Sequence, residues 1–254
     1  MKFDQHLPTE KLRAYIKYYV VTENATENEY KVFPPTGLVI GFQYQGQLSE
    51  MTQQGENQLS AAGVTGLSDH CKLFKNSANI GTILVYFTET GFSHFSKQPV
   101  HELFNLSVSL EALFDPSTVN EVEEKLAAVL TDKDRVKVVE QFLLTQLKNI
   151  ESDHLIVEAV RRIYHSKGSL RIKALSEGLL ISQSPFEKRF RKIVGTTPKK
   201  FASIVRFHAV LTELQSAKSL TDICYENNFF DQAHFIKDFK HYTGTSPENF
   251  KRTQ

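Results

Sequence analysis

The sequence predicts an α+β protein: a β-rich N-terminal domain, a helical connector, and an all-α C-terminal domain with two helix-turn-helix units joined by a linker helix. Three observations lead to this fold class. In the first third of the chain, apolar and polar residues alternate between Gly and Pro breaks, as they do in strands. No Gly or Pro occurs between Val119 and Lys167, where the apolar spacing is helical. In the last third, a 17-residue pattern recurs 49 positions further along the chain.

The N-terminal region carries the strand pattern. Residues 38–48 (LVIGFQYQGQL) and 83–92 (ILVYFTETGF) predict strands. FPPTG at 33–37 predicts a turn, because Pro cannot continue a strand and Gly accepts a positive φ. Residues 9–19 predict one helix ahead of the sheet. We therefore expect a β-rich regulatory domain over residues 1–116, and a cupin-like barrel is one form that it could take.

Residues 117–152 predict a helical connector. Residues 119–130 follow a Ser-Thr pair that can cap a helix. Residues 134–150 predict a second helix with one apolar stripe, formed by Val136, Val139, Leu143, Leu147 and Ile150. The stripe covers only about two heptads, so it is compatible both with a dimer seam and with packing on the chain's own domain.

Residues 153–254 contain the repeat. Residues 182–198 (SQSPFEKRFRKIVGTTP) align without a gap to residues 231–247 (DQAHFIKDFKHYTGTSP), with seven identities. Each copy begins with an N-cap residue, Ser182 or Asp231, and then carries Phe at positions i and i+4. Each copy ends with a Gly that can terminate the helix, followed by a Thr-Pro or Ser-Pro restart.

A shorter helix is predicted ahead of each copy, at residues 169–178 and 219–227, and residues 198–215 predict a long helix that joins the two units. A short helix, a tight turn and a second helix with a polar outer face form the helix-turn-helix pattern. The alternative is two αα-hairpins packed for their own sake, but a helical solenoid needs three or more repeats. The outer faces also combine cations with amide and small side chains, as recognition of phosphates and base edges requires.

Residues 154–254 resemble the DNA-binding domain of AraC-type transcription regulators. The resemblance is carried, in this order, by SLRIKALSEGLLIS, FEKRFRKIVGTTPKKF, IVRFHAVL and DQAHFIKDFKHYTGTSPENF. It implies that the second helices of the two units enter successive major grooves on one face of DNA. By position, base contacts are expected from Ser184, Glu187, Lys188, Gln232, Ala233 and Lys237. Phosphate contacts are expected from Arg191, Lys192 and Lys240.

The buried side of these helices is expected to carry the repeated phenylalanines, Phe186, Phe190, Phe235 and Phe239. Because they would form core, replacing one of them by Ala should cost about 3–5 kcal/mol of stability.

The sequence departs from the family pattern at several positions. Asn228 and Leu180 stand where the family frequently has Gly in the second and first turns. Asn tolerates the left-handed conformation better than most residues. Pro185 falls in the first helical turn, where its missing N–H is tolerated. Glu187 on a DNA face would repel phosphate unless it accepts a hydrogen bond from cytosine or pairs with a neighbouring cation.

The acidic and basic residues divide between the two halves. Residues 1–153 hold 13 Lys and Arg against 20 Asp and Glu, whereas residues 154–254 hold 17 against 9. A basic half joined to an acidic one is consistent with a polyanion as partner. Cys71 and Cys224 form neither a disulfide framework nor a zinc motif, which favours a reducing cytoplasm. No apolar run approaches a membrane span or a signal peptide, so a cytoplasmic location is expected.

The N-terminal domain is expected to sense a ligand, to dimerise, or both, as is common in regulators of this type. The segments FPPTGLVIGF and VYFTETGFSHFSK resemble a variant domain found ahead of such DNA-binding modules, but they name no ligand. Several aromatic residues are compatible with a pocket, although core is favoured for most: Phe42, Tyr44, Tyr86, Phe87, Phe92 and Phe95. The irregular spacing of His70, His94 and His101 does not favour a metal site. Cys71 is more readily a buried thiol than a redox sensor.

The sequence thus predicts a bacterial transcription regulator that binds double-stranded promoter or operator DNA. An activator is expected, but the residues leave repression open as well. A small-molecule effector, a second copy of the chain and RNA polymerase are further expected partners; no cofactor, metal or membrane is expected. Catalysis is disfavoured because no phosphate-binding loop, nucleophile elbow or zinc-protease motif occurs. The alternative is a protein–protein adaptor whose helix-turn-helix units have lost DNA binding.

Overall fold

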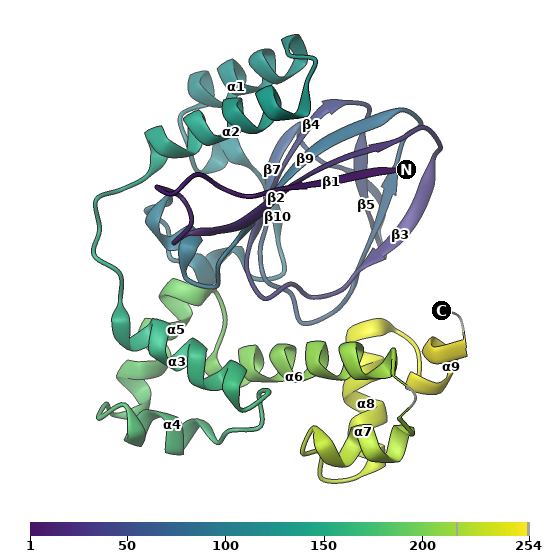
Figure 1. The fold of residues 1–254 in the computed structure, drawn as a ribbon, viewed down its shortest axis with the longest axis vertical. Helices are drawn as coiled ribbons and strands as arrows, with labels where there is room; N and C mark the ends of the chain where they lie inside the picture. The colour runs from purple at the N-terminus through teal and green to yellow at the C-terminus, as the bar shows by residue number, and fades with distance from the viewer. Residues whose placement is uncertain (217, 253–254) are drawn as a thin grey trace.

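The computed structural model describes residues 1–216 and 218–252, and in this part the chain forms a β domain followed by helices (Figure 1). The strands are β1 Lys2–His6, β2 Ile16–Asn24, β3 Asn28–Val32, β4 Val39–Gln45, β5 Leu48–Thr52, β6 Gly55–Gln58, β7 Ala62–Thr65, β8 Lys72–Asn76, β9 Ile80–Phe87 and β10 Ser107–Ser109. Three short 3₁₀ helices are η1 Gly91–His94, η2 Val100–Leu103 and η3 Leu110–Ala112. The predicted α+β class is confirmed.

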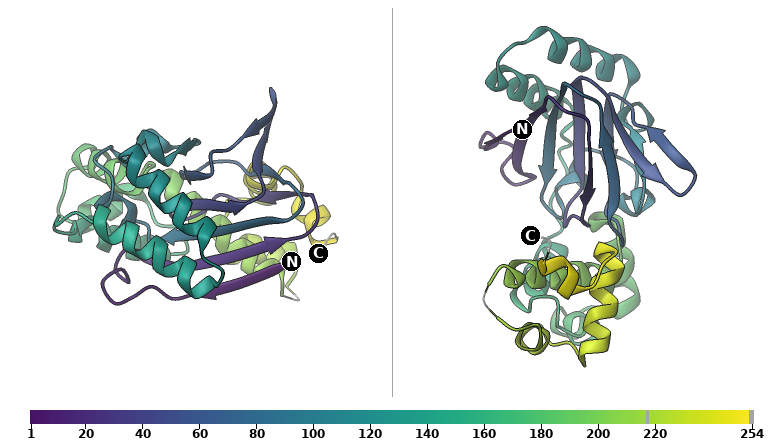
Figure 2. Two further views of the ribbon diagram at one scale, coloured as in Figure 1. Left: turned by 90° about the horizontal axis from the view of Figure 1, so that it is seen from above. Right: turned by 90° about the vertical axis from the view of Figure 1, so that its right-hand side faces the viewer.

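The strands form two antiparallel sheets (Figure 2). One sheet has the order β1-β2-β9-β4-β7-β10, and the other has the order β3-β8-β5-β6. Tyr19, Val20 and Val21 are buried in succession on β2, so this central strand of the larger sheet is covered on both faces. The predicted strand 38–48 covers β4 and reaches the start of β5, and Gly46 makes the turn between them with a φ of +73°. The predicted strand 83–92 is correct only as far as Phe87, where β9 ends, because η1 begins at Gly91.

The helix predicted over residues 9–19 is wrong. Residues 10–15 form a turn, and β2 begins at Ile16. A few hydrogen bonds of the helical kind form here, such as that from Ile16 N to Leu12 O, but they do not continue into a helix. The aromatic and β-branched run that follows then pairs with β9, where Tyr19 faces Val85. Strand pairing therefore overrides the local helical pattern.

Two helices cover the end of the β domain that lies opposite the C-terminal helices (Figure 1). They are α1 Pro116–Ala128 and α2 Asp132–Gln146. Asp115, rather than the Ser-Thr pair, caps α1, because its carboxylate accepts a hydrogen bond from Thr118 N. On α2, the Phe142 ring packs edge-on against Phe42 and Phe114. The stripe of α2 therefore packs on its own domain, with Val139 and Leu143 fully buried.

The remaining helices form the C-terminal domain. They are α3 His154–His165, α4 Ile172–Gly178, α5 Gln183–Val194, α6 Pro198–Leu214, α7 Leu220–Glu226, α8 Gln232–Thr243 and α9 Pro247–Arg252. The long helix α6 joins a first unit, α4 and α5, to a second unit, α7 and α8 (Figure 1). Among the described residues, no helix combines the length and apolar character that a membrane span requires.

The two helix-turn-helix units contact the β domain differently. The first unit shares a continuous apolar core with the β domain, whereas the second has a core of its own around α6, α7 and α8. α5 lies against η1 and η2, and an added Cβ on Gly195 would stand 3.0 Å from Val100 Cγ1. Lys200 of α6 forms an ion pair with Asp69 of the β domain. The second unit meets the β domain through Phe33.

Candidate DNA-binding interface

The second helices of the two units, α5 and α8, begin and end at equivalent positions. Both end at a glycine in the left-handed conformation, Gly195 with a φ of +100° and Gly244 with a φ of +75°. At its start, α8 is capped by Asp231, whose carboxylate accepts a hydrogen bond of 2.7 Å from His234 N. Ser182 precedes α5 with extended backbone, but its side chain makes no capping bond. The predicted capping by side chain is therefore present in the second unit only.

The turns of the two units differ in length by one residue. Four residues separate α4 from α5, but five separate α7 from α8. Leu180 and Asn228 both have a positive φ, +55° and +56°, at the position after the first turn residue. The extra residue in the second turn leaves Phe229 buried and Phe230 exposed over 88% of its surface. The sequence repeat is aligned only from the cap residues Ser182 and Asp231 onward. It therefore does not show that the turn ahead of the second cap is one residue longer.

The phenylalanines of both helices turn inward, as predicted. Phe186, Phe190, Phe235 and Phe239 are all at most 2% exposed. The Phe190 ring lies 5.7 Å from that of Phe201, and the Phe239 ring lies 5.8 Å from that of Phe207, both on α6. The linker helix thus fixes the rotation of α5 and α8 about their own axes, and the opposite faces point to solvent.

The nine predicted contact residues lie on these outward faces. All of them are exposed except Glu187, which is partly buried. Lys188, Arg191, Lys192, Lys237 and Lys240 form no ion pair with any described residue, so their charge faces solvent uncompensated. In contrast, Arg189 on the flank of α5 pairs with Asp153 at 2.7 Å.

Two polar side chains on these faces already have partners. Glu187 accepts a hydrogen bond of 2.8 Å from Gln183 and does not pair with a neighbouring cation. Gln232 donates to Thr221 Oγ1 at 2.8 Å, so the second helix is held to the first helix of its unit. The sequence did not predict these two contacts or the exposed Phe230, because they depend on side-chain rotamers and on how the turn closes.

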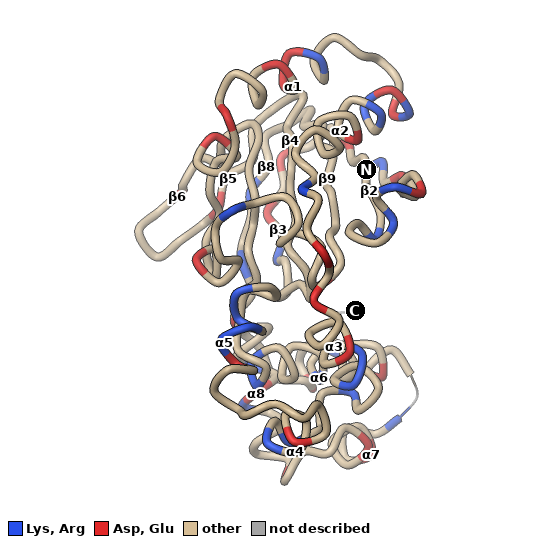
Figure 3. The backbone as a smooth tube through the Cα atoms, turned by 90° about the vertical axis from the view of Figure 1, so that its left-hand side faces the viewer, with Lys and Arg blue, Asp and Glu red and all other residues tan. Residues whose placement is uncertain are grey.

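Both recognition helices lie on the same side of α6 (Figure 3). Figure 3 also shows blue segments, which mark Lys and Arg, along α5. The β domain approaches the C-terminal end of α5, where Gly195 lies next to Val100, and Ser184 and Lys188 near the start of the helix are exposed. One face of the molecule therefore presents the outer sides of both helices together.

Elsewhere in the chain, the histidines singled out by sequence lie apart. His70 contacts Asp69 at 3.1 Å, whereas the His94 ring lies 4.7 Å from the Tyr15 ring. Within residues 1–216 and 218–252, no group of three His, Cys, Asp or Glu side chains is placed to hold a metal ion. Cys224 is buried, and Cys71 is partly buried.

Comparison with known proteins identifies both parts of the chain. Residues 175–253 match the family described as a helix-turn-helix domain, and residues 4–109 match a domain of unknown function (DUF6597). The chain is 32% identical over 119 residues to the Msm operon regulatory protein of Streptococcus mutans, covering 45% of this chain and 43% of that protein. It is 26% identical over 158 residues to an uncharacterized HTH-type transcriptional regulator of Haemophilus influenzae, covering 61% and 53%.

The chain thus spans about half the length of these two relatives. Among solved structures, ToxT from Vibrio cholerae overlaps it with a TM-score of 0.49 at 10% identity, covering 92% of this chain and 97% of ToxT.

These findings define a two-domain helix-turn-helix protein. The C-terminal match is a helix-turn-helix domain, which confirms the AraC-type resemblance over residues 175–253, and the N-terminal match is to a domain family of unknown function.

Proposed function

We propose that this chain is a sequence-specific transcription regulator that binds promoter or operator DNA through α5 and α8. One observation carries the proposal: five uncompensated cations lie on the outward faces of two helices whose phenylalanines are locked into the core. A cation that faces solvent without a partner remains available to a phosphate, and phosphate contacts supply much of the affinity for DNA.

The proposal divides the exposed residues by role. Residues near the start of each helix reach base edges: Ser184, Glu187, Lys188, Gln232, Ala233 and Lys237. Residues further along each helix meet phosphates: Arg191, Lys192 and Lys240. Gln232 can offer its amide to adenine and Lys237 its ammonium to guanine, which are favourable pairings in the major groove. Glu187 is the one carboxylate of the set and suits a cytosine amino group.

An adaptor that binds another protein is the second candidate, and the exposed Phe230 ring is the observation that favours it. Large exposed aromatic side chains are frequent at protein–protein interfaces. The uncompensated cations on α5 and α8 favour DNA instead. Salt dependence separates the two, because binding to DNA releases counterions and weakens steeply with salt.

The experiment is a fluorescence-anisotropy titration of the whole chain on DNA from upstream of its own gene and on a scrambled duplex, over a salt series. We expect preferential binding to the upstream DNA that falls steeply as salt rises. Lys188→Ala and Lys237→Ala should each weaken specific binding by about 1–3 kcal/mol. Lys125→Ala removes an exposed lysine of α1 and serves as the matched control. Binding that is equal on both duplexes, or that does not respond to salt, would contradict the proposal.

The wider partners follow from this role. We infer that the regulator acts in the bacterial cytoplasm as an activator that contacts RNA polymerase, with a second copy of the chain and a small effector as modulators. The proposal assigns it no catalytic step and no metal or cofactor. An upstream fusion to a reporter gene tests activation directly: expression should fall when the regulator's gene is deleted, and a rise would indicate a repressor.

A further inference from the structure

A cavity of about 620 Å³ lies between the two sheets of the β domain. Its lining comes from both sheets, from the loop between β3 and β4, and from His208 of α6. Small organic ligands commonly occupy sites of roughly 300–1,000 Å³. The cavity therefore has room for a ligand of that size.

Aromatic side chains from both sheets line this cavity. The Tyr18 and Tyr86 rings of the larger sheet lie 4.8 Å apart, and the Tyr30 and Phe74 rings of the smaller sheet lie 6.2 Å apart. Burial raises the pKa of Tyr30, and it raises the pKa of Tyr86 to about 12. Both hydroxyl groups therefore stay uncharged at neutral pH.

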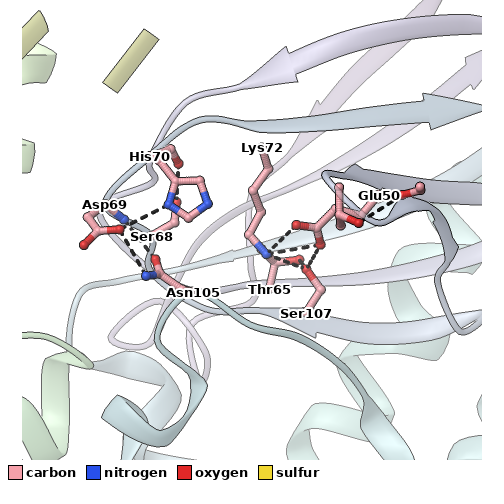
Figure 4. Close-up of polar contacts among 10 residues, drawn as sticks. Glu50, Thr65, Ser68, Asp69, His70, Lys72, Asn105 and Ser107 are labelled. Atoms are coloured by element: carbon pink, nitrogen blue, oxygen red, sulfur yellow. Dashed lines mark hydrogen bonds and ion pairs between the residues drawn. The ribbon is translucent and has the colours of Figure 1, made fainter. Parts of the chain in front are cut away.

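The lysines in the lining are already neutralised. The Lys72 side chain is only 4% exposed, and its ammonium lies 3.1 Å from Glu50 Oε1 and donates to Ser107 Oγ at 2.9 Å (Figure 4). Ser107 in turn donates to Glu50 Oε2 at 2.8 Å. Lys17 lies 2.6 Å from Glu89. An ionic ligand would bring an unpaired charge into this largely apolar site, which is unfavourable. An uncharged ligand can instead exchange a hydrogen bond with Ser107.

One wall of the cavity is also a contact with the second helix-turn-helix unit. This wall is the β3–β4 loop, residues 33–38. Within it, Phe33 lines the cavity while its ring packs against Phe207 of α6 at 5.9 Å and Phe250 of α9 at 5.7 Å. Both of those rings contact Phe239 of α8, at 5.8 and 5.4 Å. A continuous set of aromatic rings therefore connects the cavity to a proposed recognition helix.

A hydrogen bond fixes the same loop to the linker helix. His208 Nε2 donates to Pro34 O at 2.7 Å. Burial lowers the pKa of His208, so the ring is uncharged at neutral pH and the hydrogen bond does not depend on its protonation. Lys31, just before the loop, donates to Thr243 O at the end of α8 at 3.2 Å. A displacement of the loop would therefore act on α6 and α8 together.

We propose that the cavity binds an uncharged, largely apolar small molecule with one hydrogen-bonding group, and that the β3–β4 loop transmits its binding to α8. The ligand site itself does not depend on DNA binding. That transmission to α8 regulates DNA binding rests on the proposed DNA-binding function.

The ligand class is tested with two fluorescent probes of one framework. N-phenyl-1-naphthylamine is uncharged, and 8-anilino-1-naphthalenesulfonate adds one sulfonate to the same rings. We expect saturable 1:1 binding of the uncharged probe to the whole chain, at least about tenfold tighter than that of the sulfonate. Equal affinities, or tighter binding of the sulfonate, would overturn the proposal.

Substitutions locate the bound probe. Val39→Trp fills the cavity from β4 and should abolish the binding, whereas Val157→Trp on the exposed side of α3 should leave it unchanged. If circular dichroism shows that Val39→Trp is unfolded, Leu84→Trp on β9 replaces it. Probe binding that survives in a folded, cavity-filled variant would place the probe elsewhere and overturn the assignment.

The transmission step is tested by hydrogen exchange without DNA, so its failure is distinct from a failure of DNA binding. Saturation with N-phenyl-1-naphthylamine should slow exchange in the β3–β4 loop and in α8. In Phe33→Ala, at saturating probe, the loop should still respond but α8 should not. Phe250→Ala offers a second break in the ring contacts if Phe33→Ala does not bind the probe, and it should reduce the α8 response. An unchanged α8 in the wild-type chain would contradict the transmission.

Discussion

At the scale of single residues, the turn of the first helix-turn-helix unit holds a leucine in a conformation that leucine disfavours. Leu180 has a φ of +55° and is 96% exposed, so no packing offsets the strain. The left-handed conformation costs an L-residue about 1–2 kcal/mol, and Gly adopts it freely. In the second turn Asn228 adopts the same conformation, which Asn tolerates better.

We therefore expect Leu180→Gly to stabilise the protein by about 0.5–1 kcal/mol, after the larger unfolded-state entropy of Gly is subtracted. Asn228→Gly is the control and should change stability by less. Urea denaturation of the three proteins measures both effects. A destabilised Leu180→Gly variant would show that the exposed leucine makes a contact that the structure does not contain.

A second prediction at this scale concerns the ion pair between the domains. Burial alone would raise the pKa of Asp69, but hydrogen bonds from Lys200, His70 and Asn105 outweigh it and lower the pKa from 3.8 to about 2. A carboxyl group whose pKa is lowered by folding stabilises the fold above its unfolded pKa. The contribution of Asp69 is therefore complete above about pH 4 and is lost as the pH falls towards 2.

The difference in unfolding free energy between wild type and Asp69→Asn should accordingly be larger at pH 6 than at pH 3. Urea denaturation at the two pH values measures this difference. In a Lys200→Ala background the effect of Asp69→Asn should shrink, because the ion-pair partner is gone. A difference that stays constant with pH would exclude the ion pair as its source.

The residues of the candidate site show what a sequence can predict at this scale. The i, i+4 spacing of Phe235 and Phe239 was enough to place them in the core, since that spacing defines one face of a helix. When these phenylalanines face the core, Lys188 and Lys237 lie on the opposite side of their helices, so their exposure could be predicted as well. The bond from Gln183 to Glu187 and the exposure of Phe230 were not predictable, because they depend on rotamers and on the closure of the turn.

At the scale of elements, the two recognition helices differ in how they start. The Asp231 carboxylate caps α8, but Ser182 makes no capping bond to α5. A side-chain cap contributes about 0.5–2 kcal/mol of stability. We expect Asp231→Ala to destabilise the protein by about 1 kcal/mol and Ser182→Ala to change it by less than about 0.5 kcal/mol. Thermal or urea unfolding of the pair checks this; equal losses would mean that Ser182 caps α5 in solution.

Elements were predictable where local signals agreed with the tertiary contacts. The four helices of the two helix-turn-helix units and the linker helix α6 form close to their predicted ranges, because their periodic apolar residues agree with the contacts that they make. Residues 9–19 have a helical spacing too, but from Ile16 onward the chain pairs with β9 and forms a strand. A partner that is distant in the sequence cannot be seen in a local pattern, and this is why that prediction failed.

At the scale of the whole molecule, the β domain is attached to both helix-turn-helix units but in unequal ways. It shares its core with the first unit, and it touches the second through Phe33 and the ring contacts around it. The first unit therefore has the larger contact with the β domain, and the second is the unit that we propose responds to the β3–β4 loop. The sequence predicted the division of charge and the order of domains, but not this asymmetry, because interdomain contacts leave no periodic signature.

The central claim is that α5 and α8 together read DNA from one face of the molecule. Hydroxyl-radical footprinting of the whole chain on DNA from upstream of its own gene tests it most directly. We predict two protected tracts about one helical turn, or roughly 10 base pairs, apart on the same face of the duplex. Lys188→Ala should weaken protection of one tract and Lys237→Ala that of the other. A single tract that both substitutions weaken equally, or no protected tract, would contradict the account.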